Sequence, residues 1–254
     1  MYRIGIDLGG TNIAAGVVDE GQHIVAEVSL PTGAERPAEA VVADICRAAE
    51  KAMEKAGITA AHCASVGIGS PGTCDSANGV VVRAYNLGWF NVPVCSMVTA
   101  RLGLPCHLSN DANCAAIGEY WAGAAKDCDP AVVVTLGTGI GSGIIPGGKI
   151  LRGFNFAAGE MGHTVIVKGG RKCNCGRYGC WERYASSRAL SEDAREAMTR
   201  HPESMMWKLA GDIDHVNAKI PFDAMEAGDA TAKAVVDNWI EYVACGISNV
   251  VNTF

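Results

Sequence analysis

Asp7-Leu8-Gly9-Gly10-Thr11-Asn12 joins two strand-like segments, residues 2–7 and 12–18. The glycine pair between them predicts a tight turn, so we expect an antiparallel hairpin. Glycines let the backbone approach a ligand closely and direct its amides at phosphate oxygens. Thr11 and Asn12 add side-chain donors, and Asp7 at the end of a strand suits a magnesium ion held through water. For this segment taken alone, an ordinary hairpin is the alternative.

A second glycine-rich segment, Leu136-Gly137-Thr138-Gly139-Ile140-Gly141-Ser142-Gly143, has the same character. It follows a predicted buried strand at 131–136 and leads into another strand at 143–145. It lacks the Gly-Lys-Ser/Thr ending of a P-loop, and no helix follows it as in a dinucleotide-binding fold. Two such hairpins, one in each half of the chain, predict that the phosphates of a nucleotide are gripped from both sides of a cleft. The predicted binding residues are Gly9, Gly10, Thr11 and Asn12 in the first hairpin and Gly137, Thr138 and Gly139 in the second.

The order of the other predicted elements indicates an α/β protein with two halves. We expect a third strand at 23–30, a helix from Pro37 to Ala56, strands at 63–70 and 105–109, and helices at 92–102 and 110–122. Beyond Cys180 the pattern is helical to the end. A fresh start near residue 110 divides the chain into a small lobe, 1–109, and a large lobe, 110–254.

His163, Cys173, Cys175 and Cys180 offer one imidazole and three thiols over a short segment. They form a complete tetrahedral ligand set for zinc with no position left for water, and a closed site of this kind is structural. Glycines in the same segment would let the loop wrap around the ion. Buried thiols that only fill space are the alternative.

Composition excludes several classes of protein. The chain of 254 residues has a net charge of −6 and no basic block, so a nucleic-acid partner is not expected. Its start lacks the pattern of a secretory signal, and no long apolar run predicts a membrane span. The eleven cysteines are odd in number, and those outside the cluster are scattered, which predicts reduced thiols and a cytoplasmic protein.

Six motifs follow one another along the chain. They are the first hairpin, Ser70-Pro71-Gly72, Ser109-Asn110-Asp111-Ala112-Asn113, the second hairpin, Gly159-Glu160-Met161-Gly162-His163 and the cysteine-rich segment 173–180. Together they resemble the ROK family of sugar kinases and repressors, within the actin-like ATPase superfamily. The run Cys180-Trp181-Glu182-Arg183-Tyr184-Ala185-Ser186 is similar to the glucokinase branch. The resemblance implies a two-lobed, ribonuclease H-like α/β fold with a cleft between the lobes, which binds ATP with magnesium.

The resemblance also implies an activity, the phosphorylation of the 6-hydroxyl of a hexose, with glucose favoured. Asp111 would be the general base, and a helix N-cap is its alternative role. The alternative functions are a kinase for another hexose, such as N-acetylmannosamine, and a sugar-responsive transcriptional regulator without catalysis. The regulator is disfavoured because the chain begins directly in the first hairpin, without a helix-turn-helix.

The family pattern implies a set of hexose-binding residues, which are Gly72, Asn86, Asn110, Glu160, His163 and Glu182. His163 would bind zinc through one nitrogen and donate to the sugar through the other. The zinc would hold the segment of Glu182 against the segment of Glu160. The family also implies a homodimer or homotetramer. Because it further implies an adenosine-binding segment and a closing helix after Phe254, we expect this chain to be truncated at its C-terminus.

Overall fold

The computed structural model describes all of residues 1–254, which pack into two compact units. The first unit holds Met1–Ala131 and Gly143–Ala158, and the second holds Val132–Ser142 and Gly159–Phe254. Each unit has a hydrophobic core of its own. The units group residues by packing and do not test where a boundary between two lobes lies, so the division into 1–109 and 110–254 stays a prediction.

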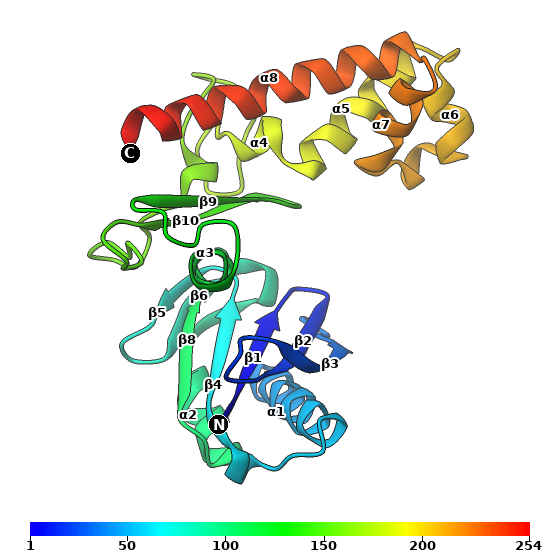
Figure 1. Ribbon diagram of the computed structural model, residues 1–254. Coiled ribbons are helices and arrows are strands. Elements are labelled where there is room, and N and C mark those ends of the chain that lie inside the picture. The colour runs from blue at the N-terminus through cyan, green and yellow to red at the C-terminus, as the bar shows by residue number, and fades with distance from the viewer. The chain divides into compact units, whose positions relative to one another are not determined.

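The first unit is built on a five-stranded sheet in the order β3-β2-β1-β4-β8 (Figure 1). β1 pairs with β2 and β2 with β3 in antiparallel fashion, whereas β1 with β4 and β4 with β8 are parallel pairs. The predicted antiparallel start is therefore confirmed. The strands are β1 (Tyr2–Leu8), β2 (Asn12–Val18), β3 (Ile24–Pro31), β4 (Cys63–Ser70) and β8 (Cys106–Asn110).

Helices cover this sheet and complete its core. α1 (Ala38–Lys55) packs against β2 and β3 and against α2 (Val94–Leu102), and α3 (Asp111–Ala122) packs against β4 and β8. Val41, Ile45 and Ala49 of α1 recur at the spacing of one helix face, and all three are fully buried. The same periodicity in the sequence predicts this helix correctly.

The sequence does not predict the three-stranded antiparallel sheet of β5 (Thr73–Asp75), β6 (Val80–Ala84) and β7 (Trp89–Val92). These strands are short, so no periodic pattern stands out over them. A 3-10 turn, η2 (Tyr85–Leu87), joins β6 to β7 and ends at Gly88, whose φ of +64° is one that glycine adopts readily.

Two predicted boundaries are wrong. The helix predicted from residue 92 begins at Val94, because the proline at 93 disfavours helical geometry at the residue before it. The strand predicted from residue 143 begins earlier, since β10 is Ile140–Ile145 and pairs with β9 (Ala131–Leu136). Ile140 and Ser142 are both buried, so the inward-facing pattern starts at Ile140.

Beyond Cys180 the second unit is helical, as predicted, but the helix is interrupted. Gly211 and Gly228, with φ of +72° and +90°, follow two of the helices and help to end them. Met198 and Met206 lie in the core that the helices enclose. The elements are α4 (Glu182–Ala185), α5 (Ser187–Arg200), α6 (Met205–Ala210), α7 (Lys219–Glu226) and α8 (Ala230–Thr253), with 3-10 turns η3 (Met161–His163) and η4 (Ile213–His215) here and η1 (Ala60–His62) in the first unit.

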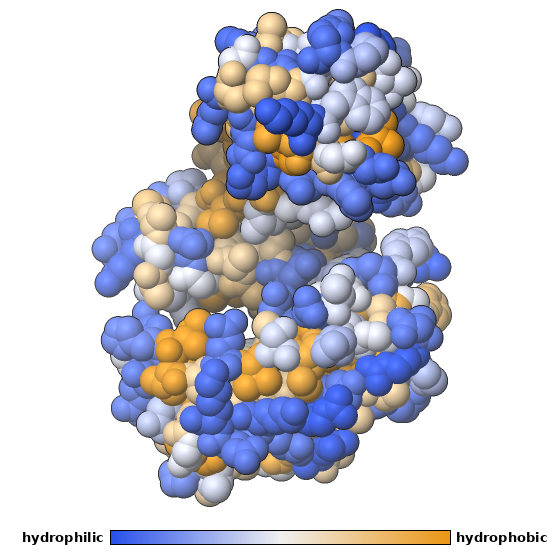
Figure 2. Space-filling view, turned by 90° about the vertical axis from the view of Figure 1, so that its right-hand side faces the viewer, coloured by the Kyte–Doolittle hydropathy of each residue, from blue (hydrophilic) through white to orange (hydrophobic).

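None of the helices combines the length and the apolar character that crossing a membrane requires. Hydrophilic residues cover much of the face drawn in Figure 2, with apolar patches among them.

Candidate active site

The carboxyl ends of three parallel strands meet at one edge of the sheet in the first unit. Asp7 of β1 lies opposite Gly69 of β4, and Ser70 of β4 lies opposite Asn110 of β8. In open α/β sheets, ligands bind at this edge. The edge therefore brings Asp7 close to the predicted base Asp111, which directly follows β8.

Asn110 is the residue that caps α3. Its Oδ1 accepts a hydrogen bond from the Asn113 amide at 3.2 Å, and its Nδ2 donates to the Gly72 carbonyl at 3.1 Å. Two predicted hexose-binding residues, Asn110 and Gly72, are thus in contact. Asp111 is the first residue of the helix, and its Oδ1 accepts a hydrogen bond from the Ala112 amide at 2.8 Å. The alternative interpretation of Asp111 as the N-cap is therefore wrong.

The surroundings of Asp111 make its carboxyl group more basic. Burial of the carboxyl group among protein atoms raises the pKa of Asp111, and the nearby charge of Asp7 raises it further. Hydrogen bonds from the Ala112 amide and the Asn110 side chain act in the opposite direction, but the pKa remains above the ordinary aspartate value. The side chain still has an exposed side through which a substrate can reach it. A carboxylate of raised pKa suits the abstraction of a proton.

The first hairpin has the tight turn that its glycines predict. The Gly9 amide donates to the Asn12 carbonyl at 2.9 Å, and a Cβ atom at Gly9 would lie 2.9 Å from the same oxygen, so a larger residue would displace the backbone. A Cβ atom at Gly10 would lie 3.5 Å from Asn86 Nδ2. The structure therefore places Asn86, a predicted hexose-binding residue, beside the predicted phosphate turn. Thr11 and Asn12 are exposed at this turn.

In the second unit, Glu182 lies where the second hairpin meets the cysteine-rich segment. Its Oε2 lies 2.9 Å from the position that a Cβ atom of Gly139 would take. Its Oε1 accepts a hydrogen bond from the Cys173 thiol at 3.1 Å and lies 3.6 Å from His163 Nδ1. Glu160 caps the 3-10 turn η3, and its carbonyl accepts a hydrogen bond from the His163 amide at 3.0 Å. Gly137 and Thr138 are exposed at the tip of the hairpin.

The four predicted zinc ligands form one cluster. Their ligand atoms all lie within 4.8 Å of one another. Cys173 Sγ is 3.6 Å from His163 Nδ1, and Cys175 Sγ is 3.6 Å from Cys180 Sγ. Tetrahedral zinc with bonds of about 2.0–2.3 Å holds its ligand atoms about 3.5–3.8 Å apart. The residues present therefore fit zinc in number and type, and the two separations of 3.6 Å match its spacing.

The thiols of the cluster differ in acidity. Burial raises the pKa of Cys173 and of Cys180. Desolvation opposes ionisation of Cys175 as well, but hydrogen bonds from Arg177 and from the neighbouring thiols lower its pKa to about 6. Since the thiolate is the form that binds metal, Cys175 is ready to bind near neutral pH.

Two residues that hold the hairpins cannot be identified from the sequence. Thr32, directly after β3, hydrogen-bonds to the first hairpin, and Ser187, the first residue of α5, hydrogen-bonds to the second. They lie 23 and 50 residues from their partners, so no local motif signals either contact. The pairing of β3 beside β2 is the one signal that could have drawn attention to Thr32.

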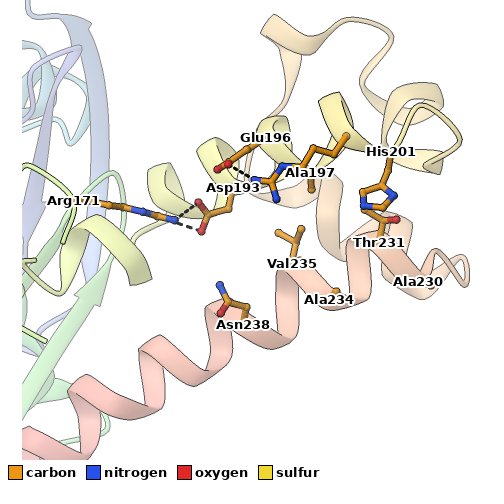
Figure 3. Close-up of a pocket in the computed structure, with 11 residues that line it drawn as sticks. Arg171, Asp193, Glu196, Ala197, His201, Ala230, Thr231, Ala234, Val235 and Asn238 are labelled. Carbon is orange, nitrogen blue, oxygen red and sulfur yellow. Dashed lines mark hydrogen bonds and ion pairs between the residues drawn. The ribbon is translucent and has the colours of Figure 1, made fainter. Parts of the chain in front are cut away.

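A groove of about 520 Å³ lies between α5 and α8 in the second unit (Figure 3). None of the predicted hexose, phosphate or zinc residues lines it. Its charged side chains pair with one another, Arg171 with Asp193 at 2.7 Å and Arg200 with Glu196. We therefore assign this groove no part in the predicted activity.

A family model described as the ROK family matches residues 3–254. This chain belongs to the ROK family. A glucokinase from Halalkalibacterium halodurans is 37% identical over 255 residues, which cover 99% of this chain and 76% of that protein. A xylose repressor from Caldicellulosiruptor bescii is 33% identical over 207 residues, which cover 81% of this chain and 51% of that protein.

Among solved structures, the ROK family glucokinase from Streptomyces griseus, in complex with glucose and AMPPNP, is similar to this chain. It matches with a TM-score of 0.88 and 38% identity, and the match covers 100% of this chain and 80% of that one. The likeness confirms the predicted fold class, the α/β, two-lobed actin-like ATPase fold of the ROK family.

Proposed function

We propose that this ROK protein transfers the γ-phosphoryl group of ATP to the 6-hydroxyl of a hexose, with glucose as the favoured acceptor. It is an ATP-dependent sugar kinase. One observation carries the proposal. The chain is similar to glucokinases along its whole length. In it, Asp111 lies at the carboxyl edge of the sheet with a raised pKa, while Asn110 serves as the cap of α3.

In the proposed reaction, Asp111 accepts the proton of the 6-hydroxyl as the hydroxyl oxygen attacks the γ-phosphorus. Asn110 binds the neighbouring hydroxyl. The turns around Gly10 and Gly139 direct backbone amides at phosphate oxygens. Asp7 holds magnesium through water, and magnesium, when bound, neutralises the charge of the phosphate oxygens.

On the family pattern, five further residues would bind the sugar, which are Gly72, Asn86, Glu160, His163 and Glu182. Carboxylates suit this task because each can accept hydrogen bonds from two hydroxyls. His163 Nδ1 faces the Cys173 thiol, which leaves Nε2 to donate to a hydroxyl.

We assign a structural role to a zinc ion held by His163, Cys173, Cys175 and Cys180. Because all four ligands are protein side chains, the ion has no open position and takes no part in the transfer. Its task is to fix the loop that carries His163 and that contacts Glu182.

We propose that the kinase is cytoplasmic and works as a homodimer or homotetramer. None of the eleven cysteines is paired in a disulfide, which suits a reducing compartment. Oligomers are common among soluble enzymes, and closed symmetric ones are the rule.

A panel of hexoses tests the function. The protein with magnesium and ATP is given glucose, mannose, allose or N-acetylmannosamine, and ADP release and sugar binding are measured in parallel. We expect ADP release with glucose. ADP release with another hexose and not with glucose would make that hexose the substrate in place of glucose. The similarity to a xylose repressor gives the regulator as the second candidate, and sugar binding without ADP release from any hexose would favour it over the kinase.

A further inference from the structure

A hydroxyl residue lies behind each of the two glycine hairpins. In the first unit, Thr32 is fully buried and makes two hydrogen bonds to the turn. Its Oγ1 donates to the Gly9 carbonyl at 2.7 Å, and its amide donates to the Thr11 carbonyl at 2.8 Å. One residue therefore holds the carbonyls on both sides of Gly10.

The hydrogen bond from Thr32 to the Gly9 carbonyl also fixes the direction of the Gly10 amide, although that amide takes no part in the bond. A peptide unit is planar and trans, so its N–H points opposite to its C=O. The Gly9 carbonyl belongs to the same peptide unit as the Gly10 amide. Since Thr32 holds that carbonyl toward the interior, the Gly10 N–H must point the other way, out of the turn.

Thr32 is itself held in place by a charged network. Arg36 donates to the Thr32 carbonyl at 2.7 Å and to Asp44 at 2.6 Å. The Asp44 side chain is buried and also pairs with Arg47 at 2.9 Å. Hydrogen bonds to charged groups are short and strong, and the Asp44 carboxylate that holds Arg36 is itself buried, so this network supports Thr32 behind the turn.

The second hairpin has a counterpart in Ser187. Its amide and its Oγ both donate to the Gly137 carbonyl, at 2.9 Å and 2.7 Å. By the same peptide geometry, the Thr138 N–H points away from α5. Ser186, the residue before it, is the cap of α5, so the Ser187 hydroxyl is available for the hairpin.

We propose that Thr32 and Ser187 are positioning residues that direct the Gly10 and Thr138 amides at the phosphates of ATP. This inference rests on the proposed function, because it takes the two hairpins to be the phosphate-binding elements. Amides fixed in direction before the ligand arrives need not be reorganised when it binds.

The test compares Thr32→Val, which keeps the shape of the side chain but removes the hydroxyl, with Thr32→Ser, which keeps the hydroxyl. We expect Thr32→Val to raise the KM for magnesium-ATP by about threefold to tenfold, the range for one hydrogen bond. The Kd for glucose should not change, and Thr32→Ser should restore the KM. Thr99→Val on the exposed face of α2 is the control for a threonine-to-valine change. A merely structural role would weaken glucose and ATP binding together.

Ser187→Ala is the second variant, because it lies at a half-buried helix start and does not depend on the buried site of Thr32. We expect the same rise in the KM for magnesium-ATP. A KM within twofold of wild type in Ser187→Ala and in folded Thr32→Val would overturn the inference. A wild-type protein without turnover on any hexose would instead overturn the proposed function, and the Kd for magnesium-AMPPNP of each variant would then test the positioning residues directly.

Discussion

Asp111 is the proposed base, and its neighbour Asn110 takes over the cap of α3. The carboxylate then stands at the end of β8, near Asp7, in surroundings that raise its pKa. The position of the Asp111 carboxylate and its raised pKa thus both arise from the sequence Asn110-Asp111, which directly follows a parallel strand.

Asp111→Asn should lower turnover by at least about a hundredfold, the usual effect of losing a general base. The Kd for glucose should stay close to that of wild type, because the amide keeps the shape of the carboxylate. Turnover by ADP release and glucose binding by calorimetry check both. Asp237→Asn, in an exposed ion pair on α8, is the matched control and should leave turnover intact. Full turnover in Asp111→Asn would refute the role.

The raised pKa of Asp111 predicts where activity is lost in acid. The proposed base works only when it is ionised, and its raised pKa keeps it protonated up to a higher pH than a free aspartate, whose pKa is about 3.9. The acid limb of the kcat/KM profile should therefore have its midpoint above about pH 4. An acid limb at or below the ordinary value would show that Asp111 is not the group that titrates.

The same shift has a consequence for stability. A carboxyl group whose pKa is raised in the folded state stabilises the fold at low pH, and this contribution is lost as the pH rises through the folded pKa. At pH 7 the ionised Asp111 therefore opposes folding. Asp111→Asn should leave the Tm at pH 7 unchanged or raise it, and a clear fall in Tm would contradict the direction of the shift.

Among the helices, α8 packs closely against Trp181 at Gly246, where there is no room for a side chain. A Cβ atom at Gly246 would lie 1.9 Å from the fully buried Trp181 ring, whose Nε1 donates to the Tyr242 carbonyl at 2.8 Å. Gly246→Ala should therefore lower the free energy of unfolding by about 1–3 kcal/mol, as overpacking does.

Gly118→Ala is the matched control for that change. Gly118 lies within α3, and a Cβ atom there would meet no atom within 4 Å. Alanine is the better helix former, so this variant should gain up to about 1 kcal/mol. Urea unfolding of both variants measures the difference, and equal shifts for the two would contradict the packing argument.

Elements with a long, regular pattern could be predicted from the sequence. Val41, Ile45 and Ala49 mark α1, and alternation marks β1 and β2. The strands β5, β6 and β7 are too short to show a period. The apolar run alone predicts too early a start for α2, because Pro93 disfavours a helix at the residue before it.

The candidate site could be predicted where its residues are close in the chain. The cluster from His163 to Cys180 and the two glycine hairpins are local patterns with a direct chemical meaning. Thr32 and Ser187 could not be found, because the contacts that give them a role arise only when distant segments fold together. The roles proposed for Asp111, Glu160 and Glu182 rest on the family resemblance as well.

For the molecule as a whole, the zinc cluster should couple metal content to sugar affinity. We expect one zinc per chain in the purified protein. Cys175→Ser should lose the zinc and raise the Kd for glucose by at least about tenfold, since it frees the loop of His163 and weakens charged hydrogen bonds to the sugar.

Cys128→Ser is the control for this loss, because Cys128 is an exposed free thiol outside the cluster. Metal analysis and calorimetry on the two variants check the prediction. Protein that holds no zinc and still binds glucose at full affinity would defeat the structural role of the ion.

The most direct measurement of the proposed chemistry is phosphorus NMR of the product formed from glucose and magnesium-ATP. With the wild-type protein, we predict a sugar phosphate whose phosphorus couples to the protons on C6, and with Asp111→Asn almost none of it after the same time. A phosphate on another carbon, free phosphate alone, or an undiminished yield from Asp111→Asn would contradict transfer to the 6-hydroxyl by this base.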